Sequence, residues 1–408
     1  MPGPQISDEE FAQRRETAKR LAKERGLDAL LIWSRSGHTV EAYGDLYYLT
    51  NFNSLFPAVP DRKSWASRGH GALILPVDGG EPVLITDYLD DPEDRIKVKD
   101  VRAVPDITVS TVDALREMDL IDRKIGLVGG MSFLMSAWRR MEERAGNHKL
   151  DFVPADDMFE RMRLIKSPGE IELIRHAAGV GVKWMDATMS AIAEGNTEGD
   201  AVGEGLKVLA ANGGTQQDIA IASGPFAINY MGSSGIPHWN VTRPMETGDL
   251  VHCDQWGPVD GYYTDFARST VVGGKPSDGQ RELLEGSMAV IHHIIDGIKP
   301  GETTFADLYR RGEKWLDDNG FANHKTSADE SNAFSSLFPC FGHSIGLGID
   351  GPWIMEDEDT VVEPNMTLAV EALVGRPGVG AANFEENIIV HEDGAEIITA
   401  PCEGKRWE

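Results

Sequence analysis

Two pairs of carboxylates, each set in the arms of a predicted β-hairpin, are the side chains of this sequence best suited to chemistry. The stretch LVHCDQWGPVDGYYTDFARSTVVG, residues 250–273, predicts two strands joined by a turn at 257–261. Asp254 and Asp265 are about equally far from the centre of that turn, so antiparallel pairing would place them roughly opposite each other on one face. Like charges placed in this way repel, which favours a divalent cation between them, although two solvated aspartates are the alternative from this hairpin alone.

The same arrangement recurs near the C-terminus. Residues 367–390, TLAVEALVGRPGVGAANFEENIIV, predict a second hairpin in which Glu371 and Glu385 are equidistant from Gly378. Because side chains alternate between the two faces of a strand, we expect Glu385 to share a face with Glu371 and the adjacent Glu386 to point away.

A fifth candidate ligand, His343, lies between the hairpins in the segment CFGHSIGLGIDGPW. Four carboxylates and one imidazole form a ligand set that suits two divalent metal ions, because four negative charges balance two doubly positive ones. The residue types do not select the metal, since carboxylate-rich sites accept Mn, Fe, Co or Zn.

Composition limits the classes of partner. The chain has 408 residues and a formal net charge of −27, which argues against nucleic acid or an anionic membrane surface as a partner because such binding needs clustered Lys and Arg. The 3 cysteines have no paired ligand spacing and indicate a reducing compartment. The charged N-terminal stretch lacks the apolar core of a secretory signal, and no apolar run is long enough for a membrane span, so we expect a cytoplasmic protein.

The elements that must position these residues fall into two predicted domains. In residues 1–160, strand-like runs, among them 47–52, alternate with helix-like stretches, which indicates an α/β domain. A capping box formed by Ser167 and Glu170 predicts the helix that opens the second domain, residues 161–408. Further helices and the two acid-bearing hairpins indicate an α+β catalytic domain.

The second half of the sequence resembles the pita-bread fold of methionine aminopeptidase, Xaa-Pro aminopeptidase, prolidase and creatinase, peptidase family M24. In that family an Asp, an Asp eleven residues later, a His, a Glu and a second Glu hold two metals in this chain order. The matching residues here are Asp254, Asp265, His343, Glu371 and Glu385. The helix sequence RLIKSPGEIELIRHAA resembles the family's domain-entry helix, and residues 1–160 match the creatinase/prolidase type of N-terminal domain in size and layout.

This resemblance implies a dinuclear metallohydrolase in which a metal-bridged hydroxide cleaves an amide bond. It implies that Asp254 belongs to one metal, that His343 and Glu371 belong to the other, and that Asp265 and Glu385 bridge the two. It also implies a homodimer that acts on a short peptide or another small molecule.

Two catalytic roles and two departures follow from the same resemblance. Glu371 would carry a proton to the leaving nitrogen, and His238 would hydrogen-bond the scissile carbonyl or the tetrahedral intermediate. A structural histidine in a loop is the alternative for His238. Prolidases and Xaa-Pro aminopeptidases usually have a histidine four residues before the metal histidine and another seven residues after it. Here those positions hold Pro339 and Asp350, which weakens the expectation of peptide hydrolysis.

Four further residues are candidate substrate-binding groups: Trp239, Trp256, Asp350 and Trp353. The tryptophans could be pocket walls or, if they converge, a cage for a cationic substrate, and Asp350 could bind a free amine. Three hypotheses therefore stay open. They are a prolidase-like hydrolase, an enzyme that cleaves a C–N or C–S bond of a small amino-acid-like or onium metabolite (creatinase, ectoine hydrolase or dimethylsulfoniopropionate lyase type), and a non-catalytic binding module.

Overall fold

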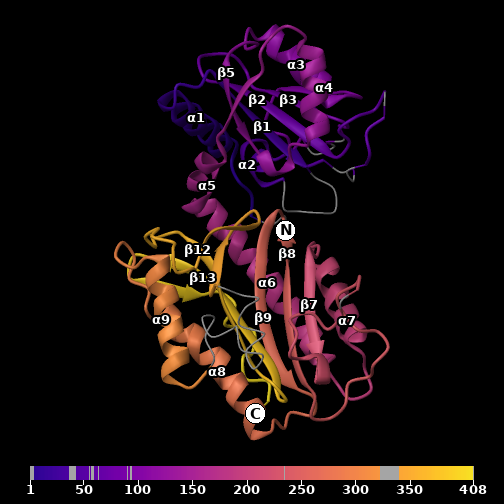
Figure 1. The fold of residues 1–408 in the computed structure, drawn as a ribbon, viewed down its shortest axis with the longest axis vertical. Coiled ribbons are helices and arrows are strands. Elements are labelled where there is room, and N and C mark those ends of the chain that lie inside the picture. Colours follow the sequence, from indigo (N-terminus) through magenta and orange to yellow (C-terminus); the bar gives the residue numbers. More distant parts are fainter. Residues whose placement is uncertain are drawn as a thin grey trace. The chain divides into compact units, whose positions relative to one another are not determined.

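The structure, a computed structural model, divides into two compact units, Gln5–Arg163 and Leu164–Glu408 (Figure 1). It describes residues 4–35, 43–54, 56, 59–62, 64–89, 91, 94–233, 235–321 and 340–407. Among these residues, no helix is both long enough and apolar enough to cross a membrane.

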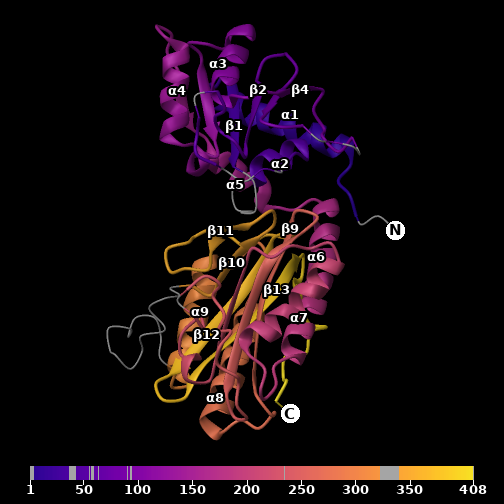
Figure 2. The same ribbon diagram turned by 90° about the vertical axis from the view of Figure 1, so that its right-hand side faces the viewer.

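The N-terminal unit is a six-stranded mixed sheet in the order β4-β3-β2-β1-β5-β6. Its strands are β1 (Ala29–Arg35), β2 (His70–Pro76), β3 (Val83–Thr86), β4 (Asp100–Ala103), β5 (Lys124–Val128) and β6 (Asp151–Pro154). Its helices are α1 (Asp8–Glu24), α2 (Gly44–Thr50), α3 (Ile107–Glu117), α4 (Met135–Ala145) and α5 (Asp156–Leu164), with a 3₁₀ turn η1 (Gly130–Ser132). Helices α1 and α2 cover one face of the sheet and α3 and α4 the other, which confirms the predicted α/β character (Figure 2).

The prediction of a strand at 47–52 is wrong, because this segment belongs to helix α2 and to the residues that follow it. Leu46, Tyr48 and Leu49 are buried, and the helix ends at Asn51, which adopts the left-handed conformation with φ 56°. Tertiary packing therefore overrides the strand preference of the aromatic and β-branched residues in this short apolar run.

The C-terminal unit combines a three-stranded sheet, β7-β8-β9, with a five-stranded sheet, β11-β10-β12-β13-β14. Its strands are β7 (Asp218–Ser223), β8 (Leu250–Val259), β9 (Tyr262–Val271), β10 (Gly342–Ile345), β11 (Ile349–Trp353), β12 (Thr367–Arg376), β13 (Gly380–His391) and β14 (Gly394–Ile397). Its helices are α6 (Pro168–Ser190), α7 (Glu198–Ala211), α8 (Asp278–Ile295) and α9 (Phe305–Asp318), with a 3₁₀ turn η2 (Gly224–Phe226). The predicted capping box of Ser167 and Glu170 is present at the start of α6.

The two sheets of this unit meet along β9 and β13 (Figure 1). Side chains join these strands: the backbone N–H of Asp265 donates to Asn387 Oδ1 at 3.1 Å, and Ser269 Oγ donates to the Asn383 carbonyl at 2.8 Å. Helices α6 and α7 pack on the β7–β9 side and α8 on the β12–β13 side, so both sheets have one helix-covered face. The other faces carry the acidic residues.

The first hairpin has a tighter turn than predicted. Asp260 and Gly261 alone form it, with φ values of 50° and 85°, as in a type I′ turn. Because residues 257–259 continue β8, Asp265 pairs with Trp256, and Asp254 pairs with Ala267. The two aspartates are therefore diagonal neighbours on one face, not directly opposed as the five-residue turn had predicted.

The second hairpin has the predicted register. Glu371 of β12 pairs directly with Glu385 of β13, and residues 377–379 connect the strands. Glu386 points to the opposite face, where its carboxylate accepts hydrogen bonds from Arg268. Both sequence expectations for this hairpin are confirmed.

Candidate metal centre

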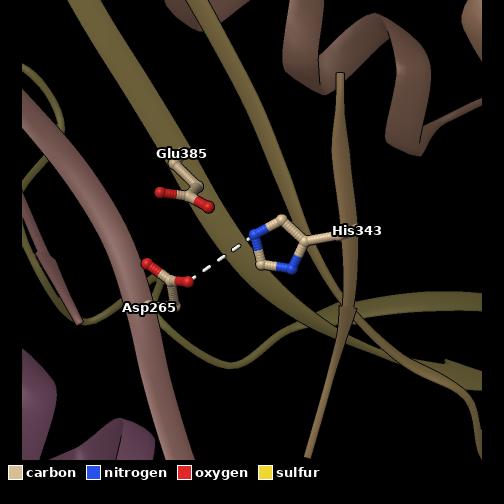
Figure 3. A group of neighbouring side chains, drawn as sticks. All are labelled: Asp265, His343 and Glu385. Atoms are coloured by element: carbon tan, nitrogen blue, oxygen red, sulfur yellow. Dashed lines mark ion pairs between the residues drawn. The ribbon is translucent and has the colours of Figure 1, made fainter. Parts of the chain in front are cut away.

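Five buried side chains from five different strands converge where the two sheets meet. They are Asp254 of β8, Asp265 of β9, His343 of β10, Glu371 of β12 and Glu385 of β13. Each is at most 5% exposed. Figure 3 shows the carboxylates of Asp265 and Glu385 pointing toward the His343 imidazole, whose Nε2 is 3.6 Å from Asp265 Oδ2.

The five residues form two groups with potential ligand atoms within 4.8 Å of one another, and Glu385 belongs to both. One group is Asp265, His343 and Glu385, and the other is Asp254, Glu371 and Glu385. These groups describe side chains that lie close together, and the assignment of Glu371 and His343 to one metal stays a prediction. Because Glu371 lies directly across the β12–β13 ladder from Glu385, its carboxylate falls with those of Asp254 and Glu385.

Burial opposes ionisation of every carboxyl group in this cluster. Desolvation raises the pKa of Asp254 to about 6 and, with the nearby charge of Asp254, raises the pKa of Glu371 to about 8. Desolvation and the neighbouring carboxylates also raise the pKa values of Asp265 and Glu385 well above their usual range. Four ionised carboxylates can coexist at this depth only if cations neutralise them.

The imidazole of His343 is prepared to act as a ligand. Burial lowers its pKa to about 4, so the ring is neutral at physiological pH. Its Nδ1 lies 3.0 Å from the carbonyl oxygen of Ser344, an arrangement in which an Nδ1–H donates to that carbonyl. The Nε2 lone pair is then left to face the carboxylates, as in metal-binding histidines.

The donor atoms fit two divalent cations. Among the residues that the structure describes, the buried oxygens Asp254 Oδ1 and Glu385 Oε2 have no hydrogen-bond partner. An unpaired buried acceptor is costly, and a cation would satisfy it. Carboxylate oxygens with one imidazole nitrogen suit Mn, Fe, Co or Zn, so the residue set agrees with a dinuclear centre.

Tyr230, in the loop after β7, joins the cluster although nothing in the sequence pointed to it. Its hydroxyl donates to Asp254 Oδ2 at 2.5 Å. Burial, with the nearby charges of Asp254 and Glu371, raises the pKa of this phenol well above its usual range, so it remains a donor. The loop has no periodicity from which the direction of this side chain could be inferred.

His238 lies at the border of the acidic face. Its Nδ1 is 2.9 Å from Asp218 Oδ2, although the contact is not aligned as a hydrogen bond. Asp218 pairs with Trp256 across β7–β8, and Trp256 pairs with Asp265 across β8–β9. Directly paired residues share a face, so Asp218 and Trp256 lie on the side of the sheet that carries the candidate ligands. Asp218 had not been identified from the sequence.

The remaining candidates for substrate binding lie in different environments. The Trp353 ring packs against the His343 ring, with centroids 4.8 Å apart, and is 40% exposed. Trp239 instead packs on the hydrophobic cluster beneath α6 and α7, behind the acidic face. Asp350 is half-buried in β11, where it pairs with Ser344. Pro339 lies outside the described residues.

Comparison with known proteins agrees with this geometry. The family model described as Metallopeptidase family M24 matches residues 172–392, and the model described as Creatinase/Prolidase N-terminal domain matches residues 14–165. The chain is 27% identical to the Xaa-Pro dipeptidase of Pyrococcus furiosus over 335 residues, which cover 81% of this chain and 87% of that protein. It is 24% identical to a creatinase from a Bacillus species over 410 residues, which cover 97% and 92% of the two chains.

Among solved structures, the prolidase from Pyrococcus horikoshii OT3 superposes with a TM-score of 0.75 at 21% identity, covering 95% of this chain and 98% of that one. At this identity the likeness shows the fold, which is the α/β N-terminal domain followed by the pita-bread domain. The match over more than half of the sequence shows that the chain belongs to metallopeptidase family M24 and carries a creatinase/prolidase N-terminal domain.

Proposed function

We propose that the chain is a dinuclear metal-dependent hydrolase that cleaves the amide bond of Xaa-Pro dipeptides or closely related short peptides. The observation that carries this proposal is the buried cluster of four carboxylates and one neutral imidazole, in which Glu385 is common to two ligand groups. The similarity to an Xaa-Pro dipeptidase over most of both chains supports the class of substrate.

Two divalent ions held by these five residues would activate a water molecule as the nucleophile and polarise the scissile carbonyl. The surrounding side chains would handle protons and orientation. Glu371, which lies with Asp254 and Glu385 in the buried cluster, would accept a proton from the water and pass it to the leaving nitrogen. Tyr230 would hold Asp254 in place, and His238 would donate a hydrogen bond to the carbonyl oxygen from the border of the site.

A panel of Xaa-Pro dipeptides, assayed before and after chelation, tests this proposal. We expect hydrolysis that chelator abolishes and that added Mn²⁺ or Zn²⁺ restores. Glu371→Gln should lower kcat on the order of 10³-fold, because it removes the proton carrier and a ligand. Glu363→Gln, an exposed neighbour, is the matched control and should keep full activity. Metal-loaded protein that cleaves none of these peptides would contradict the peptidase assignment.

A second candidate function is cleavage of a C–N or C–S bond in a small cationic metabolite. Two indoles border the cluster: Trp353 packs on His343 and is 40% exposed, and Trp256 shares a face with Asp265. Aromatic faces bind quaternary cations well. The similarity to a creatinase over 97% of this chain also supports this candidate. Amidine and onium compounds added to the same panel would distinguish the two functions, and turnover of these compounds alone would favour the second.

A further inference from the structure

One buried carboxylate of the C-terminal unit lies outside the metal cluster and joins two distant parts of the chain. Glu198, the first residue of α7, is 0% exposed. Its Oε1 accepts a 2.7 Å hydrogen bond from Ser223 Oγ, and its Oε2 accepts a 2.6 Å hydrogen bond from the backbone N–H of Asn240. A carboxylate buried so deeply is costly unless donors compensate it, and both of its oxygens have one here.

The two donors mark the ends of one loop. Ser223 is the last residue of β7, and the chain returns to the start of α7 at Asn240. Glu198 therefore joins the two ends of a loop whose described residues are 224–233 and 235–239, the anchored loop. A second bond reinforces the closure, because the backbone N–H of Gly199 donates to the Asn240 carbonyl at 3.1 Å.

The middle of the anchored loop touches the same carboxylate. The backbone N–H of Gly232 donates to the Ile221 carbonyl at 2.7 Å. A Cβ placed on Gly232 would lie 2.4 Å from both Glu198 Oε2 and the Ile221 carbonyl oxygen, so there is no room for a larger residue. Glu198 therefore lies next to the start, the middle and the end of the loop, at Ser223, Gly232 and Asn240.

Two residues of the anchored loop face the candidate metal centre. Tyr230, two positions before Gly232, donates to Asp254. His238, two positions before Asn240, contacts Asp218 at the border of the acidic face. Each side chain thus lies two residues from a point that Glu198 fixes, and neither belongs to a helix or strand. Before Tyr230 the loop has two further contacts, because the Ala227 carbonyl accepts from the Ala381 N–H at 2.8 Å and the Asn229 carbonyl lies 2.9 Å from His252 Nε2. The contacts of Glu198 hold the part that follows.

We propose that Glu198 is a positioning residue for the hydrolytic site: its carboxylate fixes the anchored loop so that Tyr230 reaches Asp254 and His238 reaches the substrate. This inference rests on the proposed function for its kinetic consequence, but its structural consequence can be measured without any substrate. The geometry assigns Glu198 no contact with substrate or metal.

The structural arm of the test is hydrogen–deuterium exchange of the full-length, metal-loaded protein. In Glu198→Ala we expect amide exchange in peptides covering 224–240 to rise about ten-fold or more, while peptides of β9 and β13 and the metal content stay unchanged. Glu198→Gln can turn its amide oxygen to the Asn240 N–H and donate from its amide nitrogen to Ser223 Oγ, so its effect should be smaller. Glu204→Gln, an exposed residue of the same helix, is the control and should change nothing.

The kinetic arm is a double-mutant cycle with His238→Ala. If Glu198 acts through the loop, Glu198→Ala should lower kcat/KM about ten-fold or more in the wild-type background and by a clearly smaller factor beside His238→Ala, where only the contribution through Tyr230 remains. Equal losses in both backgrounds, unchanged exchange in 224–240, or faster exchange spread over the whole unit would each overturn the proposal. If Glu198→Ala does not fold, Ser223→Ala removes one of the two hydrogen bonds and takes its place. Wild-type protein without peptidase activity would contradict the proposed function only, because the exchange arm would still decide the inference.

Discussion

The two faces of strand β13 each carry a buried glutamate, but the two glutamates differ in their charged neighbours. Glu385 and Glu386 are consecutive, have identical side chains and are 1% and 3% exposed. On one face, Glu386 accepts two 3.0 Å hydrogen bonds from Arg268 Nη2 and so meets its counter-charge within the protein. On the other face, Glu385 meets three more carboxylates and a neutral imidazole. The contrast indicates that the second face is built for cations supplied from outside.

The N-terminal unit also has a buried carboxylate that is paired with an arginine of the same protein, as Glu386 is. Its buried Asp87 pairs with Arg68 at 3.1 Å and also accepts hydrogen bonds from the Ser54 hydroxyl and the Gly69 backbone. A buried carboxylate with a full set of donors stabilises the folded unit only weakly. Removing one of its partners lowers the free energy of unfolding strongly, because an unpaired charge stays buried. Among the described residues, the carboxylates around Glu385 are buried without a cationic side chain beside them, and clusters of this kind are candidates for functional sites.

The largest effect should come from replacing the Glu385 carboxylate, on the face of β13 that carries the candidate ligands, by an amide. Glu385→Gln removes the ligand common to both groups and should lower kcat on the order of 10³-fold and abolish binding of at least one metal. Because it also removes a repelling charge, the metal-free protein should be no less stable. Metal analysis, turnover and thermal unfolding of Glu385→Gln beside Glu363→Gln check this, and a variant with two tightly bound metals would refute the shared-ligand role.

The next largest effect belongs to the paired face. Arg268→Met leaves Glu386 buried without its cation and should cost about 3–5 kcal/mol of unfolding free energy. Replacing both partners, as Arg268→Met with Glu386→Leu, should recover only part of this loss. No unpaired charge remains, but the carbonyls of Ala267 and Glu385 lose the hydrogen bonds that Arg268 donates. Denaturant unfolding of the single and double variants measures both values. If the unfolding free energy of Arg268→Met is within about 1 kcal/mol of that of the wild type, the Arg268–Glu386 pair does not stabilise this face.

The free energy of unfolding of the metal-free protein should fall as pH rises, because buried carboxyl groups of the cluster have raised pKa values. Burial raises the pKa of Asp254 to about 6 and of Glu371 to about 8, so the folded state holds protons that the unfolded state has lost. Stability is therefore lost as pH rises toward 8 and these groups are forced to ionise.

Thermal unfolding in chelator at pH 6, 7 and 8, repeated with Mn²⁺, measures this dependence. We expect the slope to disappear with metal, since cations compensate the ionised groups, and to flatten in Glu371→Gln even without metal. Chelated wild-type protein that gains stability between pH 6 and pH 8 would argue that the carboxylates do not repel one another.

The smallest expected effect concerns Trp353, which borders the cluster without belonging to it. Trp353→Ala should raise KM by a few-fold to about ten-fold, corresponding to about 0.5–1.5 kcal/mol of lost ring contact, with metal content unchanged. Trp353→Phe should keep most of the contact, and Trp138→Phe in the N-terminal unit is the control. Loss of metal from Trp353→Ala would instead show that the ring is needed to hold His343.

The four candidate carboxylate ligands could be found from the sequence because strand periodicity fixes the face of each side chain, whereas His343 was identified from its place between the hairpins and from the family resemblance. For Glu371 and Glu385 strand periodicity also gave the exact partner, since the Arg376–Gly380 segment centres the hairpin on Gly378. For Asp254 and Asp265 the face was right and the register was two residues off, because the turn is the Asp260-Gly261 pair alone.

The supporting residues could not be predicted in this way. Tyr230 lies in a loop, where no period gives direction, and Asp218 joins the site only through the pairing of β7 with β8. Glu198 reads in the sequence as an ordinary acidic residue in the first turn of a helix, and its partners Ser223 and Asn240 are distant along the chain. Contacts of this kind depend on tertiary packing, which local patterns do not encode.

The most direct test of the central claim is anomalous diffraction from crystals of the protein purified without chelator and grown with Mn²⁺. The geometry predicts two anomalous peaks at the meeting of the two sheets, one in each ligand group, with Glu385 contacting both. A single peak, or peaks away from these five residues, would contradict the dinuclear centre.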